Sequence, residues 1–378
     1  MIRIMFLIRS LERAGAERQL VELVKQIDYQ QFEIAVATFY EQGVLSAEIK
    51  NIKGIKLIGL GKKGRWDVFG FLQRLNTEVR IFRPHILHGY LDVGNILAWI
   101  IGRLNGAKVI FGVRASNMDF SRYDWTVRLV YQLVALSAWF SDKIIVNSNV
   151  GLEYHKKQGF PSHKMTIIHN GIDTQKFKPD SMLREKTRKM LGVQTNDILI
   201  GTIGRLDPMK DHQTFLRAAA IVSKIHASTK FVCIGRTSEP YFSQIQSLAH
   251  ELDLETNLQW VEEQQDIQDF YNALDIFVSS SSYGEGFSNV IGEAMASGTP
   301  CIVTDVGDSS LIIGQTGKSV PPQNLSLLAE AIIKLVQSSH ETRKELGLKA
   351  RRRIIEKFSL NKMVANTQEV FIKVMNEH

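Results

Sequence analysis

The sequence alternates short apolar runs with longer segments of helical periodicity along almost its whole length. Such alternation predicts parallel strands joined by helices that cover both faces of a sheet. The alternation occurs in two series, which predicts an α/β protein made of two facing, doubly wound (Rossmann-like) parallel-sheet domains. The strand candidates of the first series are "IRIMFLI", "FEIAVATF", "IKLIGL", "HILH", "AKVIFGV", "DKIIVNS" and "MTIIHN", and those of the second are "DILIGTIG", "KFVCIG", "LQWV", "DIFVSSS" and "PCIVTD".

A polar segment separates the two series. Residues 176–197, "KFKPDSMLREKTRKMLGVQTND", are strongly charged and lack strand character, so we place the domain boundary near residues 180–196. A chain of 378 residues is long enough for two full cores. Ligands of open α/β sheets bind at the carboxyl ends of the strands, and the cleft between two such domains is the expected site.

Composition restricts the class of protein. Two cysteines exclude a disulfide framework and fit a reducing, cytoplasmic compartment. No run of 18 apolar residues occurs, so no membrane span is expected, and "ILAWIIG" and "LVYQLVALSAWF" are interpreted as buried helices. Residues 1–10 are interpreted as a first strand rather than a signal peptide, because Arg3 and Arg9 interrupt a short apolar run.

The most informative motif is "EGFSNVIGE", which begins at Glu285 and ends at Glu293. We expect a loop at residues 281–286 and a helix from about Phe287, closed by Gly298 and Pro300. The backbone amides of Gly286, Phe287 and Ser288 would then open the helix and form an anion site.

The spacing of the two glutamates suggests what the site binds. Eight helical residues rise about 12 Å, which is too far for both carboxylates to hold one metal ion. A sugar nucleotide would use every feature: Glu285 would bind sugar hydroxyls, the helix amides the diphosphate, and Glu293 the ribose. The alternative is that Glu293 is a solvated helix residue and Glu285 an N-terminal capping acid.

Cations lie at the end of another strand in the same domain. "IGTIGRLDPMKD" ends a strand at Gly204 and then offers Arg205 and Lys210. Arginine can bind two phosphate oxygens and lysine adds a point charge, so we expect both to contact phosphate. In the first domain, Gly15 follows a strand and permits close approach of a ligand, but no G-x-G-x-x-G fingerprint is present.

Two other kinds of site are excluded. "IGQTGKS" resembles a P-loop, but Ile312 stands where that motif needs glycine, and "VPPQ" follows where a helix is required. We find no D-x-D acid pair to hold a metal–diphosphate complex. His85 and His88 lie three apart on a strand candidate, on opposite faces, which makes a poor zinc site. We therefore expect no metal site and no cofactor other than the donor substrate.

Together these stretches resemble the retaining GT-B glycosyltransferases of the large family four. The motifs that carry the resemblance cover nearly the whole chain: "RAGAER", "IIHNGIDTQKF", "GRLDPMKD" and "EGFSNVIGEAMASGTPCIVTD". The resemblance implies an acceptor-side domain over residues 1–180, a nucleotide-sugar domain over 181–357, and a C-terminal helix over 358–378 that returns to the first domain. It also implies transfer of a hexosyl or N-acetylhexosaminyl group from a nucleotide sugar, which in the family is commonly a UDP-sugar and sometimes a GDP-sugar. Because the D-x-D pair is missing and Arg205 and Lys210 can stand in for an ion, we expect this transfer to need no metal.

The resemblance also implies roles for individual residues. Glu285 would contact the donor sugar, Glu293 the ribose, and Arg205 and Lys210 the diphosphate. The Gly15 loop would close over the donor, and His88, in "PHILHGY", would lie on the acceptor side. The sequence departs from the family in two places, since Arg114 and Tyr90 stand where histidines are frequent. Arg114 is therefore a candidate catalytic residue, and the choice of acceptor or sugar is open.

Three hypotheses about the function are open. The leading one is sugar transfer to a glycan or polyprenyl-diphosphate-linked acceptor in cell-surface polysaccharide synthesis. A UDP-sugar 2-epimerase of the same fold is the alternative, and it would need no acceptor. The third is nucleic-acid binding, because residues 1–180 carry 25 Lys and Arg against 16 Asp and Glu, whereas residues 181–378 carry 21 against 23. These basic residues are scattered and match no RNA-binding module, so we expect no nucleic-acid partner.

The excess of positive charge instead suggests a membrane. "GKKGRWDVFGFLQRL" places Lys62, Lys63 and Arg65 beside Trp66, Phe69 and Phe71, and "SRYDWTVRLVYQLV" has a similar mixture. Basic residues next to aromatic ones suit an anionic interface. We therefore expect a cytoplasmic enzyme in peripheral contact with the inner face of a membrane, the alternative being a solvated basic face over a core helix.

Overall fold

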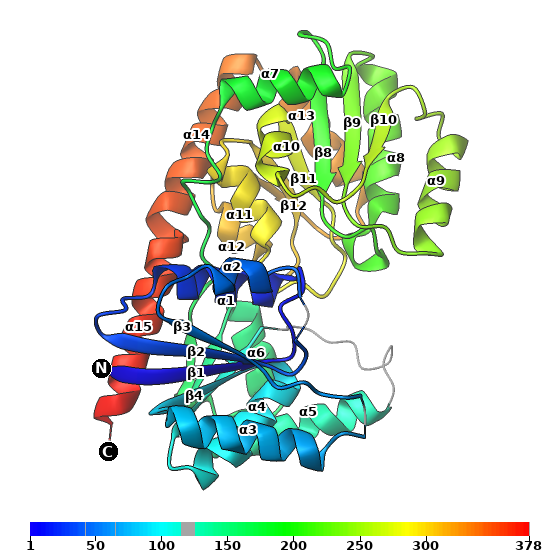
Figure 1. Ribbon diagram of the computed structural model, residues 1–378. Coiled ribbons are helices and arrows are strands. Elements are labelled where there is room, and N and C mark those ends of the chain that lie inside the picture. Colours follow the sequence, from blue (N-terminus) through cyan, green and yellow to red (C-terminus); the bar gives the residue numbers. More distant parts are fainter. Residues whose placement is uncertain (42, 65, 115–124, 378) are drawn as a thin grey trace. The chain divides into compact units, whose positions relative to one another are not determined.

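The computed structural model describes residues 1–41, 43–64, 66–114 and 125–377. The chain forms two compact units, one of Met1–Gly171 with Leu360–His378 and the other of Ile172–Ser359. Each contains one parallel sheet with helices on both faces, as the alternation predicted (Figure 1). Among the described helices, none combines the length and the apolarity needed to cross a bilayer.

The first unit is built on a seven-stranded sheet in the order β3-β2-β1-β4-β5-β6-β7. Helices α1, α2 and α15 cover one face, and α3, α4 and α5 cover the other (Figure 1). The strands are β1 (Ile2–Ile8), β2 (Phe32–Thr38), β3 (Ile55–Gly59), β4 (Ile86–Tyr90), β5 (Lys108–Val113), β6 (Lys143–Val146) and β7 (Met165–Ile167). The helices are α1 (Gly15–Gln26), α2 (Ser46–Lys50), α3 (Phe69–Phe82), α4 (Leu91–Leu104), α5 (Trp125–Ala138), α6 (Asn149–Lys157) and α15 (Leu360–Asn376).

The C-terminal helix α15 is part of the first unit although it follows the second along the chain. Its Phe371 is fully buried, and the ring packs edge-on against Phe6 of β1 and Phe32 of β2. Gly171 lies so close to α15 that a Cβ would meet the Leu360 backbone at 2.7 Å. The helix therefore completes the core on one face of the sheet.

The second unit has a six-stranded sheet in the order β10-β9-β8-β11-β12-β13. Helices α8, α9 and α13 pack on one face, and α10, α11, α12 and α14 on the other. The strands are β8 (Ile198–Ile203), β9 (Thr229–Ile234), β10 (Leu258–Val261), β11 (Ile276–Ser279), β12 (Cys301–Thr304) and β13 (Lys318–Val320). The helices are α7 (Ser181–Met190), α8 (His212–Ile225), α9 (Tyr241–Glu251), α10 (Ile267–Ala273), α11 (Asn289–Ala296), α12 (Ser309–Ile313), α13 (Leu325–Gln337) and α14 (His340–Lys357).

Strand β13 occupies the segment that resembles a P-loop. Lys318 begins this edge strand, and α13 starts only at Leu325, so the Gly-Lys pair does not open a helix.

Both cysteines lie in buried strands, and burial raises the pKa of each thiol. They are therefore core residues.

The interpretation of "ILAWIIG" and "LVYQLVALSAWF" as buried helices is wrong in part. Both form helices, α4 and α5, whose inner faces are buried at residues such as Ile101 and Val134. Their outer faces leave large apolar side chains in solvent, because helices on an outer layer bury only one side. Ile100 of α4 is 39% exposed, and Leu133 and Leu136 of α5 are 48% and 64% exposed.

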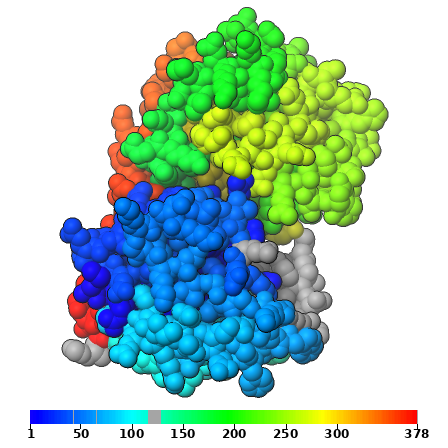
Figure 2. All heavy atoms as spheres, in the orientation of Figure 1, coloured from blue at the N-terminus to red at the C-terminus, as the bar shows by residue number. Residues whose placement is uncertain are grey.

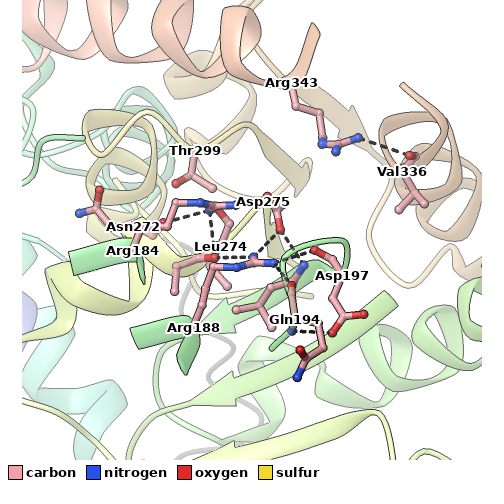
Figure 3. Close-up of polar contacts among 12 residues, drawn as sticks. Arg184, Arg188, Gln194, Asp197, Asn272, Leu274, Asp275, Thr299, Val336 and Arg343 are labelled. Carbon is pink, nitrogen blue, oxygen red and sulfur yellow. Dashed lines mark hydrogen bonds and ion pairs between the residues drawn. The ribbon is translucent and has the colours of Figure 1, made fainter. Parts of the chain in front are cut away.

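A buried ion cluster fixes α7 to the sheet of the second unit (Figure 3). Asp275, just before β11, accepts from Arg184 at 2.6 Å and from Arg188 at 2.8 Å. Its second carboxylate oxygen also accepts from the Leu199 amide of β8 at 2.8 Å. Arg188 additionally donates to the Asp197 carbonyl at 2.7 Å. The cluster therefore joins the polar segment before the sheet to its two central strands.

Replacement of Asp275 by alanine should strongly destabilise the second unit, because it leaves the guanidinium of Arg188 buried without its carboxylate. Removing one partner of a buried pair typically costs about 3–5 kcal/mol. Urea unfolding followed by circular dichroism should show a large fall in midpoint for Asp275→Ala and almost none for Glu251→Ala, an exposed acid of α9. Equal midpoints for the two variants would contradict the assignment.

Candidate functional site

Two loops meet at the carboxyl edge of the second sheet, where β8 lies between β9 and β11. The chain leaves β8 toward one side of the sheet and later returns on the other, so β8 and β11 flank the switch point where α/β proteins bind ligands. The loops are tied together, since Ser280 donates to the Lys210 carbonyl at 2.8 Å and the Ser282 amide to the Met209 carbonyl at 2.9 Å.

Two glycines make this meeting of loops possible. Gly204 has φ +147°, and a Cβ there would lie 3.4 Å from Cε of Lys210. Gly284 has φ +77°, and a Cβ there would lie 2.7 Å from Sδ of Met209. A side chain at either position would be strained because of the positive φ, and at Gly284 it would also displace the Met209 side chain.

Lys210 and Glu285 form a buried ion pair at the switch point. The Nζ of Lys210 lies 2.5 Å from Oε1 of Glu285, and the Ser281 hydroxyl donates to the same oxygen at 2.9 Å. The two side chains are 15% and 10% exposed. Burial alone would raise the pKa of Glu285, but Lys210, the Ser281 hydrogen bond and the more distant charge of Arg205 outweigh it, so that the pKa is lowered. Glu285 is therefore a carboxylate at neutral pH.

Arg205 lies at the rim of this site. Its side chain is 67% exposed and lies 3.2 Å from Oδ2 of Asp207, whose Oδ1 accepts from the Met209 amide. The structure therefore places Lys210 in direct contact with Glu285, whereas Arg205 acts on that carboxylate only through its longer-range charge.

The expected start of the helix after Glu285 is wrong. Helix α11 begins at Asn289 with Ser288 as its N-cap, so Gly286, Phe287 and Ser288 precede the helix rather than open it. The physical reason is packing: Phe287 is buried against Phe358, and the Gly286 carbonyl accepts from the Asp308 amide at 2.9 Å. The 12 Å rise expected between the two glutamates therefore does not apply, because only the last part of the motif is helical.

Ser288, the N-cap residue of α11, has a buried hydroxyl that forms no hydrogen bond among the described residues. Its side chain is 3% exposed, it does not cap the helix, and its Oγ has no hydrogen-bond partner in the described structure. A buried hydroxyl without a partner is costly unless something else uses it. The N-terminus of α11 thus combines a positive helix end with an unused hydrogen-bonding group.

Glu293 lies one turn further along α11. Its Oε2 accepts a hydrogen bond from the hydroxyl of Tyr271 at 2.8 Å, and Tyr271 itself is fully buried in α10. Burial, followed by the charge of Glu293, raises the pKa of Tyr271 well above its ordinary value, so this phenol stays a donor. Glu293 is therefore held by the core and is not a freely moving surface acid.

In the first unit, Gly15 is the first residue of α1, and the helix has no side-chain cap at Ala14. Two residues later Glu17 is buried, and its Oε2 has no partner in the described residues. Burial raises the pKa of Glu17, against the lowering effects of its own backbone hydrogen bond and of Arg114.

His88, Tyr90 and Arg114 form one cluster in the first unit. The Arg114 guanidinium stacks over the Tyr90 ring at 4.9 Å and donates to the Tyr90 hydroxyl at 3.2 Å and to Asn170 at 2.8 Å. The ring centroids of His88 and Tyr90 are 4.8 Å apart. The two positions that depart from the family pattern therefore contact each other.

His88 itself is 1% exposed. Burial, with a smaller effect of Arg114, lowers the pKa of His88 to about 3, so its ring is neutral at pH 7. Neither ring nitrogen has a hydrogen-bond partner in the described part of the chain. Its role on the acceptor side stays a prediction, and it would require a substrate to reach a buried ring.

The sequence motifs did not identify two residues of this site, Ser281 and Tyr271. Ser281 lies in the serine run before Glu285, and its spacing of four residues from that acid was an available signal. Tyr271 lies in α10 and gave no signal in the sequence, because its contact with Glu293 arises from tertiary packing alone.

Across residues 1–41, 43–64, 66–114 and 125–377, no group of three or more His, Cys, Asp and Glu is placed to hold a metal ion. The expectation of metal-independent chemistry stays a prediction.

Comparison with known families decides the identity. The family model described as "Glycosyl transferases group 1" matches residues 184–353, and the model "Glycosyltransferase Family 4" matches residues 13–176. The chain is a GT-B glycosyltransferase of group 1.

Relatives and solved structures agree with this assignment. The glycosyltransferase is 29% identical to spore coat protein SA of Bacillus subtilis over 96% of its own chain and 95% of that protein. It is 24% identical to the UDP-Gal:alpha-D-GlcNAc-diphosphoundecaprenol alpha-1,3-galactosyltransferase of Escherichia coli, over 77% and 76% of the two chains. Anabaena Alr3699/HepE in complex with UDP-glucose has the same fold, with a TM-score of 0.85, 18% identity, and coverage of 99% of this chain and 100% of that one.

We expect the Lys210–Glu285 pair to make the free energy of unfolding depend on pH. Because the folded-state pKa of Glu285 is lowered, the pair stabilises the fold above the carboxyl's ordinary pKa of 4.5, and this contribution is lost as pH falls below it. In Lys210→Met the carboxylate is buried without a cation, so the loss of stability should be large at pH 7, on the order of 3 kcal/mol, and smaller at pH 4. Urea unfolding at the two pH values measures this difference.

The double variant Lys210→Met/Glu285→Gln is the matched control. It removes both charges, so its stability relative to the wild type should depend less on pH than that of Lys210→Met. If Lys210→Met loses the same stability at pH 4 and pH 7, the two groups are not coupled in the way that the structure indicates.

Proposed function

We propose that this glycosyltransferase moves a hexosyl or N-acetylhexosaminyl group from a UDP-sugar to a glycan or polyprenyl-diphosphate-linked acceptor, with retention of anomeric configuration, in the synthesis of a cell-surface polysaccharide. The observation that carries the proposal is the buried Lys210–Glu285 pair beside the start of α11, at the switch point of the second sheet. This is the position at which α/β proteins bind nucleotides.

The surroundings of the pair fit a nucleoside diphosphate sugar. Lys210 and Arg205 are the cations for the diphosphate, and the positive end of α11 with the Ser288 hydroxyl adds hydrogen-bond donors. Glu285 faces the sugar, and Glu293, held by Tyr271, accepts from the ribose hydroxyls. UDP is favoured over GDP because HepE binds UDP and UDP-glucose in its crystal structures and the Escherichia coli relative is named for UDP-Gal.

The chemical step follows from these charges. As the bond between sugar and diphosphate breaks, negative charge grows on the leaving phosphate and positive charge on the sugar. Lys210 and Arg205 stabilise the first and the Glu285 carboxylate the second. Fixed protein cations of this kind can replace a bound metal ion as stabiliser of the leaving group, so we propose a metal-independent reaction.

The test is donor hydrolysis without acceptor. The protein is incubated with a panel of UDP- and GDP-sugars, with and without EDTA, and the released nucleotide is measured. Release of UDP from at least one UDP-sugar, unchanged by EDTA, is the expected result. Release only from GDP-sugars, or rescue of an EDTA-inhibited reaction by Mg²⁺ or Mn²⁺, would overturn the corresponding part of the proposal. Conversion of a UDP-sugar into an isomer without release would identify an epimerase.

Single variants separate the roles of the two glutamates. Glu285→Gln should lower turnover by about 10²–10³-fold with little change in UDP affinity, because its charge acts mainly in the transition state. Glu293→Ala should weaken UDP binding about tenfold or more, since a hydrogen bond to a charged group contributes roughly 1.5–3 kcal/mol. Calorimetry with UDP and hydrolysis rates give the two numbers. Glu330→Ala, which changes an exposed acid of α13, is the control. Loss of UDP affinity in Glu285→Gln and loss of turnover alone in Glu293→Ala would contradict the roles assigned to the two glutamates.

We also propose that the first unit contacts an anionic membrane. Trp66 and Phe69 are each 89% exposed at the start of α3, next to Lys62 and Lys63. Arg65 and residues 121–124 of the second predicted segment lie outside the described residues. The part of the chain coloured blue to cyan makes up much of the face of this unit that Figure 2 shows. Exposed aromatic side chains beside lysines are typical of a lipid interface.

Vesicle co-sedimentation tests the membrane proposal. At low salt the wild type should sediment with phosphatidylglycerol vesicles and not with phosphatidylcholine vesicles, because both charge and apolar area contribute. Trp66→Ala/Phe69→Ala should lose most of this binding. Met182→Ala/Met190→Ala removes two exposed apolar side chains from α7 and should bind as the wild type does. Equal binding to both kinds of vesicle, or by both double variants, would contradict the proposal.

A further inference from the structure

Three arginines line an open hollow on the surface of the first unit. Arg3 lies at the start of β1, Arg80 in the last turn of α3, and Arg83 directly after that helix. The hollow has a volume of about 800 Å³. Its other lining residues are Thr77, Ile81 and Phe82.

The hollow lies at the edge of the sheet opposite the candidate site residues of this unit. Arg3 and its neighbour His85 lie where β1 and β4 begin, whereas Tyr90 and Arg114 lie where β4 and β5 end. Since parallel strands bring their beginnings to one edge and their ends to the other, the arginines belong to a separate surface.

Hydrogen bonds hold the cluster in place. Arg3 donates through Nε to the Arg83 carbonyl at 2.7 Å, and its backbone amide donates to Nδ1 of His85 at 3.0 Å. Arg83 has φ +51° and donates its amide to the Val79 carbonyl at 2.8 Å. Within the described part of the chain, Arg3 is therefore anchored through Nε and the backbone, and not through the terminal nitrogens of its guanidinium.

The charges of the cluster are poorly neutralised. Among the described residues, no ion pair joins Arg3, Arg80 or Arg83 to a carboxylate, and Arg80 and Arg83 are exposed. Burial first, then the charges of Arg3 and the chain's amino group, lower the pKa of His85, and Glu33 opposes them. Glu33 is the register neighbour of Arg3 on β2. Three arginines that form no ion pair among the described residues leave a positive potential, which an anion would relieve.

We propose that this hollow binds a phosphate-bearing anion, either a free diphosphate or the phosphate of a lipid headgroup. Guanidinium groups bind phosphate oxygens in pairs, and three of them around one hollow suit a group with two or more negative charges. Ile81, which is 61% exposed among the arginines, adds an apolar contact beside the anion. The site is separate from the proposed donor site and does not depend on that assignment.

The test compares the full-length wild type with Arg80→Gln/Arg83→Gln, which removes two charges at exposed positions and keeps Arg3 and its hydrogen bonds. Lys344→Gln/Arg352→Gln, two exposed residues of α14, is the control with the same change in charge. Calorimetry with sodium pyrophosphate forms one arm. Co-sedimentation with vesicles containing phosphatidic acid, against phosphatidylcholine alone, forms the other.

The expected result is a loss of affinity of about tenfold or more in Arg80→Gln/Arg83→Gln and little change in the control, in at least one arm. A loss with pyrophosphate identifies a free anion as sufficient, and a loss confined to the phosphatidic acid vesicles identifies a lipid headgroup. Any binding of pyrophosphate at the donor site is common to all three proteins and cancels in the comparison. Equal affinities of both double variants in both arms would overturn the proposal.

Discussion

The placement of β8 between β9 and β11 is the constraint on which the candidate site depends. It makes the loops that follow β8 and β11 leave the same edge of the sheet and meet there. The buried Lys210–Glu285 ion pair then joins the two loops, and the Ser281 hydroxyl and hydrogen bonds between the loops support it. The site is thus a consequence of topology first and of side-chain chemistry second.

Most of the fold could be predicted from the sequence because its signals are local. Buried parallel strands appear as short apolar runs, and the helices between them keep an amphipathic period. Strand β13 was missed because "KSV" is short, polar and at the edge of the sheet, where burial leaves little trace in the sequence. The start of α11 was misplaced because Phe287 packs on Phe358, a residue 71 positions away that no local pattern reveals.

The candidate site could be predicted only in part for the same reason. Glu285 and Lys210 were each selected from their own motif, but their direct contact depends on how two loops fold together. The hydrogen bond from Tyr271 to Glu293 and the stacking of Arg114 on Tyr90 also join residues that are far apart along the chain. Motifs therefore identify the residue types that do chemistry, whereas tertiary structure decides which of them act on one another.

The charges of the site bear on how a donor would bind. Lys210 is balanced by Glu285, and Arg205 by Asp207, so these four side chains carry no net charge. A diphosphate adds at least two negative charges, and under the proposed function both cations stabilise it by turning part of their hydrogen-bonding capacity from carboxylate to phosphate. Lysine has three donors and arginine five, so this sharing is chemically available. As Lys210 turns toward phosphate, Glu285 loses part of its own neutralisation. Under the proposed function that unbalanced carboxylate lies next to the sugar, where positive charge develops as the bond to the diphosphate breaks.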